Sequence, residues 1–89
     1  NILQDNSINR ITKHFKHSLV SLSLAALDQI TDASLYSISV YLGANLTSLS
    51  LSGCNKLTQN GLITLIEHCT LLSYLNFSTC YHNVTDNVI

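Results

Sequence analysis

Charged residues are scarce in this sequence. They make up 10% of its 89 residues, against roughly 25% in typical soluble proteins. The formal net charge is −1, so the chain has no overall field that would attract nucleic acid or anionic lipid. With so few charges on so small a body, we expect part of the surface to be covered by flanking repeats of a parent chain.

The sequence also has little of what catalysis and cofactor binding need. Its glycines form no phosphate-binding loop; they are Gly43, Gly53 and Gly61. Its carboxylates are few; they are Asp5, Asp28, Asp32, Glu67 and Asp86. Asp5, Asp32 and Asp86 recur at the same position of the sequence repeat described below. Capping of a helix accounts for an aspartate at that position, so these residues do not indicate a catalytic triad. We therefore expect neither an enzyme nor a cofactor.

Cysteines are limited to Cys54, Cys69 and Cys80, with no CxxC pair and no tight metal-ligand spacing. This pattern favours free, buried thiols in a cytoplasmic or nuclear protein. A disulfide or metal pair between Cys54 and Cys80 is the alternative, because we expect them on adjacent turns. His68 and His82 lie near cysteines but at opposite phases of the repeat, so no zinc site is expected.

Two features bear on membranes. The segment from Ala33 to Asn55 contains no charged residue, and it is long enough to span a bilayer. However, it is rich in serine and the repeat described next cuts across it. No basic region followed by an apolar run begins the chain, so no signal peptide is expected. The first residue is Asn1 rather than methionine, which fits a fragment or a processed product.

A leucine pattern repeats along the chain. Leu19-x-x-Leu22-x-Leu24-x-x-Leu27 recurs as Leu46-x-x-Leu49-x-Leu51-x-x-Cys54, and then as Leu72-x-x-Leu75-x-Phe77-x-x-Cys80. The interval between the second and third copies of this pattern is one residue shorter than the interval between the first and second copies. The alternation of the last two apolar positions of L-x-x-L-x-L is what a short, half-buried strand requires.

The second half of each unit repeats as well. Leu35, Ile38 and Leu42 have the three-and-four spacing of one helix face, and Leu62, Leu65 and Cys69 repeat it. Shifted backwards by one repeat, the same pattern reaches Ile8, Ile11 and Phe15. Threonines precede the helical segments at Thr31, Thr58 and Thr85, where N-caps are expected.

These patterns predict an α/β chain in which short parallel strands alternate with helices. We expect strands near residues 21–24, 48–51 and 74–77, and helices near 5–16, 32–43 and 59–69. The expected architecture is a leucine-rich-repeat solenoid with its strands on the concave face and its helices on the convex face. As a single repeat segment, it divides into a partial repeat (1–18), two repeats (19–45 and 46–71) and a second partial repeat (72–89).

The pattern resembles the cysteine-containing class of leucine-rich repeats found in F-box receptors of ubiquitin ligases and their F-box-free relatives. The residues that carry the resemblance are Leu46, Leu49, Leu51, Gly53, Cys54, Leu57, Thr58, Gly61, Leu62, Leu65 and Cys69. Leu27 and Leu42 depart from the class because they stand where it has cysteines, and His82-Asn83 lengthens one turn. The resemblance implies a protein-recognition role in a ubiquitin-ligase complex, although no F-box segment is present.

The residues between the strand leucines would face the concave side, where we expect a protein partner. The candidate partner-binding residues are Ser21, Ser23, Ser48, Ser50, Tyr74, Asn76 and Ser78. Tyr74 is the one large side chain among them, and tyrosine is enriched at binding hot spots. Alternatively, these serines only solvate the sheet and the partner contacts other repeats of a longer protein.

Two function classes therefore remain. The first is a protein-interaction module, as in the substrate-recognition repeats of an F-box-type receptor. The second is a structural or sensing repeat scaffold, of an immune-type receptor or the cytoskeleton, unrelated to ubiquitin.

The two ends of the repeat stack have features of their own. Arg10, Lys13 and Lys16 form a local basic group, which is either a solvated helix face or a patch for phosphate or an acidic partner. Ile8, Ile11 and Phe15 are expected to be exposed beside it, with Leu75, Phe77 and Val84 at the other end. This exposure favours self-association.

Overall fold

Helices and strands alternate along the whole of residues 4–77, the part of the chain that the structure, a computed structural model, describes. The elements are α1 (Asp5–His14), β1 (Ser21–Ser23), α2 (Asp32–Leu42), β2 (Ser48–Ser50), α3 (Gln59–His68) and β3 (Tyr74–Asn76). Each helix begins where the repeat predicts a helix. Residues 4–77 therefore form three successive helix–strand units.

The three strands form one parallel sheet in the order β1-β2-β3. Leu22 pairs with Leu49, and Leu49 pairs with Leu75, so equivalent positions of the sequence repeat lie side by side in the sheet. The ladder continues beyond the short strands, because the amide of Leu24 donates to the carbonyl of Ser50 at 2.8 Å. The prediction of parallel pairing is confirmed.

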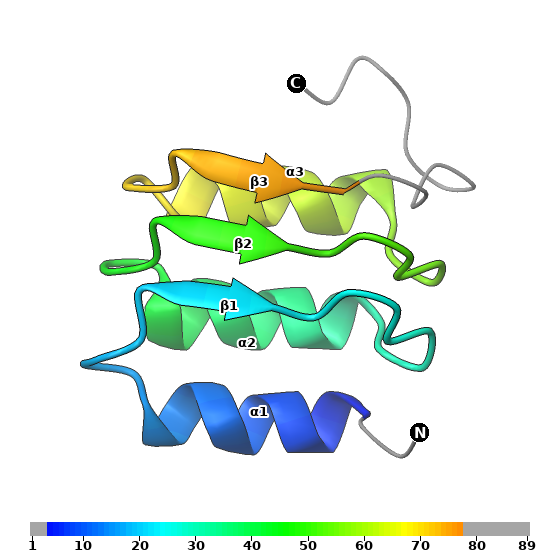
Figure 1. Cartoon of the computed structure of the whole chain (residues 1–89), viewed down its shortest axis with the longest axis horizontal. Coiled ribbons are helices and arrows are strands. Elements are labelled where there is room, and N and C mark those ends of the chain that lie inside the picture. The colour runs from blue at the N-terminus through cyan, green and yellow to red at the C-terminus, as the bar shows by residue number, and fades with distance from the viewer. Residues whose placement is uncertain (1–3, 78–89) are drawn as a thin grey trace.

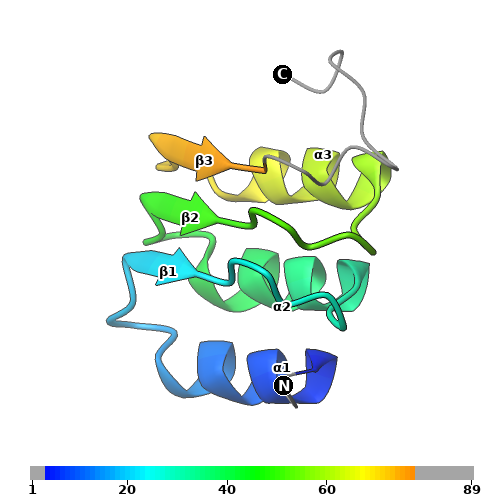
Figure 2. The same cartoon turned by 45° about the vertical axis from the view of Figure 1, so that its right-hand side comes forward.

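The helices lie in a second layer on one side of the sheet (Figures 1 and 2). In this layer α1 packs against α2, and α2 packs against α3. Neighbouring strands lie about 4.8 Å apart, whereas packed helices need about 8–10 Å. The helix layer therefore fans out more widely than the strand layer, as the turned view in Figure 2 shows.

The core lies between the two layers and consists almost entirely of the repeated leucine positions. Leu49, at the centre of the middle strand, is fully buried, whereas its equivalents Leu22 and Leu75 are only partly buried. The fully buried set also includes Ile30, Leu35, Ile38, Leu42, Leu46, Leu51, Leu57, Leu62 and Leu65. A strand leucine is thus covered completely only where its unit has a neighbour on both sides.

Threonine side chains begin two of the helices, as predicted. The Thr31 hydroxyl accepts a hydrogen bond from the amide of Ala33, and the Thr58 hydroxyl accepts one from the amide of Gly61, each at 3.2 Å. Each bond satisfies an amide that the helix itself leaves unpaired. The helices end one or two residues before the predicted positions. The third predicted cap, Thr85, lies outside the described residues.

The exposure predicted for the first helix is wrong in part. Ile8 is 1% exposed because α2 covers it. Ile11 and Phe15 are 37% and 44% exposed, as expected of positions that have no strand beside them. At the other end Leu75 and Phe77 are partly buried, and Val84 lies outside the described residues.

Ala26 and Gly53 occupy the same place in successive turns after the strands. Both have positive φ, at 64° and 81°. The turns around them match, because the amides of Leu27 and Cys54 donate to the carbonyls of Leu24 and Leu51. Only glycine adopts this left-handed conformation without a steric cost.

We expect Ala26→Gly to raise the free energy of unfolding by up to about 1 kcal/mol, because relief of the left-handed strain outweighs the added freedom of the unfolded chain. Gly53→Ala should lower it by about 1 kcal/mol, since it introduces the same strain. Urea unfolding of both variants measures the difference. If the two changes shift stability in the same direction, the turns are not equivalent.

Candidate interaction surface

The polar residues between the strand leucines gather on the outer face of the sheet, which we call the strand face. The strand period of two turns Leu22, Leu49 and Leu75 toward the helices, so the flanking residues point the other way. Strand register then aligns them in two columns across the sheet. One column is Ser21, Ser48 and Tyr74, and the other is Ser23, Ser50 and Asn76.

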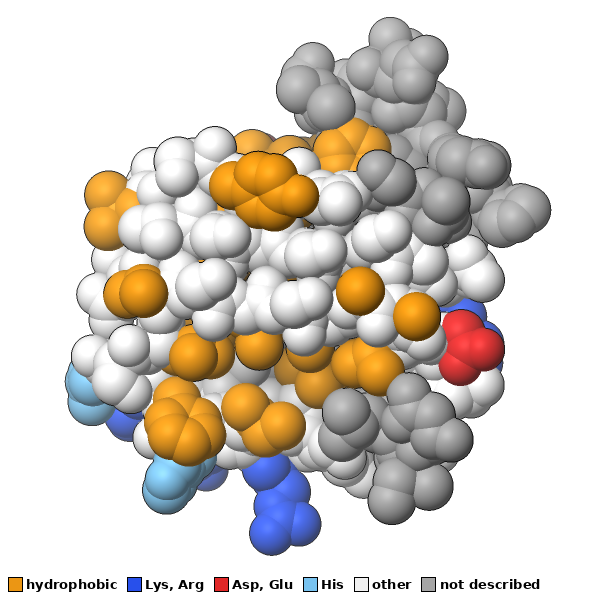
Figure 3. Space-filling model, viewed as in Figure 1, with side chains coloured by type: hydrophobic (Ala, Val, Ile, Leu, Met, Phe, Trp, Pro, Cys, Tyr) orange, Lys and Arg blue, Asp and Glu red, His pale blue; other side chains and the backbone are white. Residues whose placement is uncertain are grey.

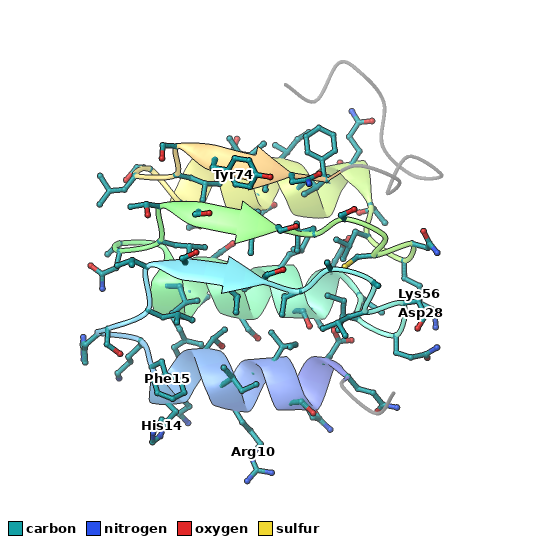
Figure 4. The ribbon with its side chains drawn as sticks, in the orientation of Figure 1. Arg10, His14, Phe15, Asp28, Lys56 and Tyr74 are labelled. Carbon is teal, nitrogen blue, oxygen red and sulfur yellow. The ribbon has the colours of Figure 1, made fainter. Side chains whose placement is uncertain are left out.

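Six of the seven predicted partner-binding residues are thus brought together, and the seventh, Ser78, lies outside the described residues. Ser21 and Ser23 are exposed, and Ser48 and Ser50 are half-buried between neighbouring strands. Tyr74 is 53% exposed at the end of its column. Figure 4 shows its ring lying over the strand face. The surface is therefore a row of small hydroxyls that ends in one aromatic ring.

The strand face is nearly free of charge. In Figure 3 its described side chains are neutral, and lysine, arginine and acidic side chains lie only at the margins of the view. Such a surface gives little long-range attraction, so recognition there would rest on hydrogen bonds, close approach and aromatic contact. The strand face thus lacks the positive charge with which proteins contact the phosphates of nucleic acids.

The described cysteines lie in the core as thiols, with no disulfide between them. The Cys54 thiol donates a hydrogen bond to the Leu24 carbonyl of the preceding turn, at 3.0 Å. Burial raises the pKa of the Cys69 thiol, which keeps it protonated. Cys80, the possible pairing partner of Cys54, lies outside the described residues. Both described thiols therefore act as packing groups.

Asp5 and Asp32 have a role that sequence reasoning missed. Their repeated phase predicts caps of their own helices, yet each carboxylate reaches the threonine that begins the next helix. Asp5 accepts from the Thr31 amide at 2.8 Å and from the Thr31 hydroxyl at 2.7 Å. Asp32 accepts from the Thr58 amide at 2.9 Å and also from the Thr58 hydroxyl. We call these contacts the aspartate bridges.

Each aspartate bridge orients the helix cap as well as joining two units. Because the threonine hydroxyl gives its hydrogen to the carboxylate, its lone pairs face the first amides of the helix. The negative charge also lies at the amino end of the following helix, where the helix dipole favours it. The signal that could have revealed this role is the constant spacing between aspartate and threonine, which occurs twice.

Hydrogen bonding changes the acidity of Asp5. Burial acts to raise the pKa of Asp5, but hydrogen bonds from Ser34 and Thr31 stabilise the charged form and outweigh it. The net effect is a pKa below the ordinary aspartate value. The carboxylate is thus held ionised as an acceptor, which is the opposite of what a general acid requires.

A groove on the helix side lies between α2 and α3. Its lining residues are Asp32, Tyr36, Asn60, Gly61 and Thr64. A Cβ atom at position 61 would collide with the carboxylate of Asp32, so a larger residue there would displace this carboxylate from its bridge to Thr58. The one carboxylate of the groove already bonds Thr58, so the groove presents no free acid or base pair.

Residues 4–77 contain no cluster of three or more histidine, cysteine or acidic side chains that could hold a metal ion. The His68 ring is hydrogen-bonded within its own helix, at 2.9 Å from the Thr64 carbonyl. His82 lies outside the described residues. None of the helices in this part of the chain is long and apolar enough to cross a membrane.

The fold is that of an α/β protein made of repeated helix–strand units. It is similar to that of a chain in the crystal structure of the Rad7 and Elc1 complex in yeast, with a TM-score of 0.83 and 24% sequence identity. The likeness covers 98% of the present chain, which spans 21% of the length of that chain. No family model matches the sequence, and no curated protein matches it.

The aspartate bridge from Asp5 predicts a loss of stability in acid. Because the pKa of Asp5 is lowered in the folded protein, the bridge contributes fully to the free energy of unfolding above about pH 4. This contribution is lost as the pH falls through the pKa of Asp5 in the folded state. Asp5→Asn should therefore lower the free energy of unfolding by about 1–2 kcal/mol at neutral pH. Denaturant unfolding at several pH values should show this difference shrinking below about pH 4.

Asp28→Asn is the matched control, because Asp28 is exposed in the turn after β1. Its effect on stability should be small at neutral pH. A difference between wild type and Asp5→Asn that stays constant down to about pH 2 would contradict the ionised bridge.

The described thiols should be inert in the folded protein. In a Cys80→Ser background, we expect a thiol reagent to modify Cys54 and Cys69 only as fast as the core opens, because both are buried and Cys69 has a raised pKa. Reaction followed by absorbance in native buffer and in urea measures this. Rapid native labelling of Cys54 would show that it is accessible.

Proposed function

We propose that this chain is a protein-binding segment of a leucine-rich-repeat solenoid, and that its partner lies across the strand face. The observation that carries the proposal is the alignment of Tyr74, the one tyrosine of the described strands, with rows of small hydroxyl side chains. Tyrosine supplies a large contact area at low entropic cost, and serines allow the backbone of a partner to approach closely.

The arrangement supports binding better than catalysis. The described carboxylates Asp5 and Asp32 are engaged in structural bridges, and the described cysteines are buried. A surface of hydroxyls with one aromatic ring has neither an activated nucleophile nor a base beside it. Flanking repeats in the same protein would extend this surface on both sides.

The proposal extends to a substrate-recognition role in an F-box-type ubiquitin ligase. Two observations support it. The unit from Leu46 to Cys69 resembles the cysteine-containing repeats of such receptors. The structurally similar chain comes from a complex of two proteins, Rad7 and Elc1. Because a fold alone does not define a function, the partner must be established by experiment.

The proposed location is cytoplasmic or nuclear. The support for it is the chemistry of the two described cysteines, which are packed in the core as thiols rather than joined in a disulfide.

Tyr74→Ala should weaken binding of the partner by about 1–3 kcal/mol without unfolding the protein. The partner is first captured by a photo-crosslinking residue at position 50, and its affinity for wild type and variant is then measured by calorimetry. The expected loss arises because the ring is the one large contact on the strand face.

Tyr36→Ala is the matched control, because Tyr36 is a tyrosine 66% exposed on the helix side. It should bind the partner as tightly as wild type. Leu49→Ala separates binding from folding, since loss of this fully buried side chain should cost about 2–5 kcal/mol of stability. Equal affinities for Tyr74→Ala and wild type would favour a structural scaffold over a recognition surface.

A further inference from the structure

The first turn of α3 contains a chemically reactive pair of residues. Asn60 precedes Gly61, and it is the one asparagine of the sequence that is followed by glycine. Glycine has no side chain that would shield its main-chain amide or restrict the backbone beside it. The amide nitrogen of the glycine can therefore attack the side-chain carbonyl carbon of the asparagine. Whether this pair reacts depends on its geometry in the fold.

The packing of α2 against α3 brings this pair next to an aspartate bridge. The carboxylate of Asp32 occupies the space that a side chain at position 61 would need, so glycine leaves room for the bridge to Thr58. Gly61 is buried, whereas Asn60 is exposed and lines the groove between α2 and α3 together with Asp32. The aspartate bridge and the reactive pair therefore share one junction.

Hydrogen bonds hold this part of α3 in the helical conformation. The Gly61 amide donates to the Thr58 hydroxyl at 3.2 Å, and the amide and hydroxyl of Thr58 both donate to the Asp32 carboxylate. Attack on the Asn60 side chain requires the backbone to rotate away from the helical ψ of about −42°.

The same rotation separates the Gly61 amide from the Thr58 hydroxyl. The folded geometry thus keeps the nitrogen and the carbon from reacting, and the reaction is confined to the moments when the first turn of α3 opens. Because Asp32 fixes the position of Thr58, it also determines how often this turn opens.

We propose that Asn60 is a site of spontaneous deamidation, and that the aspartate bridge from Asp32 controls its rate. When the first turn of α3 opens, the Gly61 nitrogen forms a bond to the side-chain carbonyl carbon of Asn60. The bond from that carbon to the side-chain nitrogen breaks, and ammonia leaves with the hydrogen that the Gly61 nitrogen loses. Water then opens the resulting succinimide ring at either of its carbonyl carbons, which yields aspartate or isoaspartate at position 60.

Both products weaken the junction of α2 with α3. An aspartate at position 60 places a second negative charge in the groove that Asp32 already lines. An isoaspartate adds one atom to the main chain just before Gly61, which moves the Gly61 amide away from the Thr58 hydroxyl. Deamidation would thus turn a slow chemical step into a lasting loss of contact between two units.

The test incubates the full chain at mildly alkaline pH and measures conversion of each asparagine by peptide mapping and mass spectrometry. Chromatography of the peptide that contains position 60 separates its aspartate and isoaspartate forms. In urea, where the helix is absent, we expect Asn60 to react faster than every other asparagine of the chain. In native buffer its conversion should be about tenfold or more slower than in urea.

Two matched variants separate opening of one turn from unfolding of the whole chain. Asp32→Ala removes the bridge beside Asn60 and should raise its native rate of conversion about five- to thirtyfold. Asp5→Ala removes the equivalent bridge between α1 and α2, and it should change this rate much less because α3 keeps its own bridge. In urea both variants should react at the wild-type rate.

A second measurement needs no variant, so the proposal can be tested even if Asp32→Ala does not fold. In wild type at urea concentrations below the unfolding transition, conversion of Asn60 should rise in step with hydrogen exchange of the Gly61 amide. Three outcomes would overturn the proposal: equal rates in native buffer and in urea, equal acceleration by Asp32→Ala and Asp5→Ala, or a conversion rate that does not follow exchange at Gly61.

Discussion

No helix–strand unit of this protein can bury its own leucines, and the rest of the structure depends on that constraint. Leu22, Leu49 and Leu75 occupy the same place in three successive strands, yet only Leu49 is fully buried, because among the described strands only β2 has a neighbour on each side. Stability therefore resides in the junctions between units rather than in the units. Local propensity contributes little, since the strands are so short.

The junctions are polar as well as apolar. At the amino ends of the helices the aspartate bridges join successive units, and along the first two helices Asn9 donates to the Ser37 hydroxyl at 2.9 Å. On the strand side the Thr47 hydroxyl donates to the Val20 carbonyl. Apolar contact alone would tolerate a slip of one unit against the next. These directional bonds, placed at both layers, permit one register.

The order and phase of the elements were predictable from sequence because they depend on periodicity. The strand and helix spacings around Leu49 and Leu65 are local patterns, and the threonine caps mark where helices begin. Helix ends were less predictable, because they are set by turns such as the one in which the Phe15 amide bonds the Ile11 carbonyl. The burial of Ile8 was missed because it depends on how far α2 reaches over α1.

The candidate site was predictable to the extent that it follows from alternation. Tyr74 and the serines had to share a face once the leucines pointed inward. The bridge from Asp5 to Thr31 was not predictable in this way. It depends on how closely two successive units pack in space, and a residue pattern within one unit does not give that distance.

The aspartate bridges also bear on how such a protein can change its length. Both bridged junctions join the same two phases of neighbouring units, aspartate on one side and threonine on the other, at the same offset along the chain. If a whole unit were duplicated or deleted as a block, the newly adjacent units would meet with these partners already opposite each other. Gene-level gain or loss of a unit would then need no compensating substitution at the joint. Arrays of this kind can lengthen in whole steps, whereas a change of a few residues within a unit would separate each aspartate from its threonine.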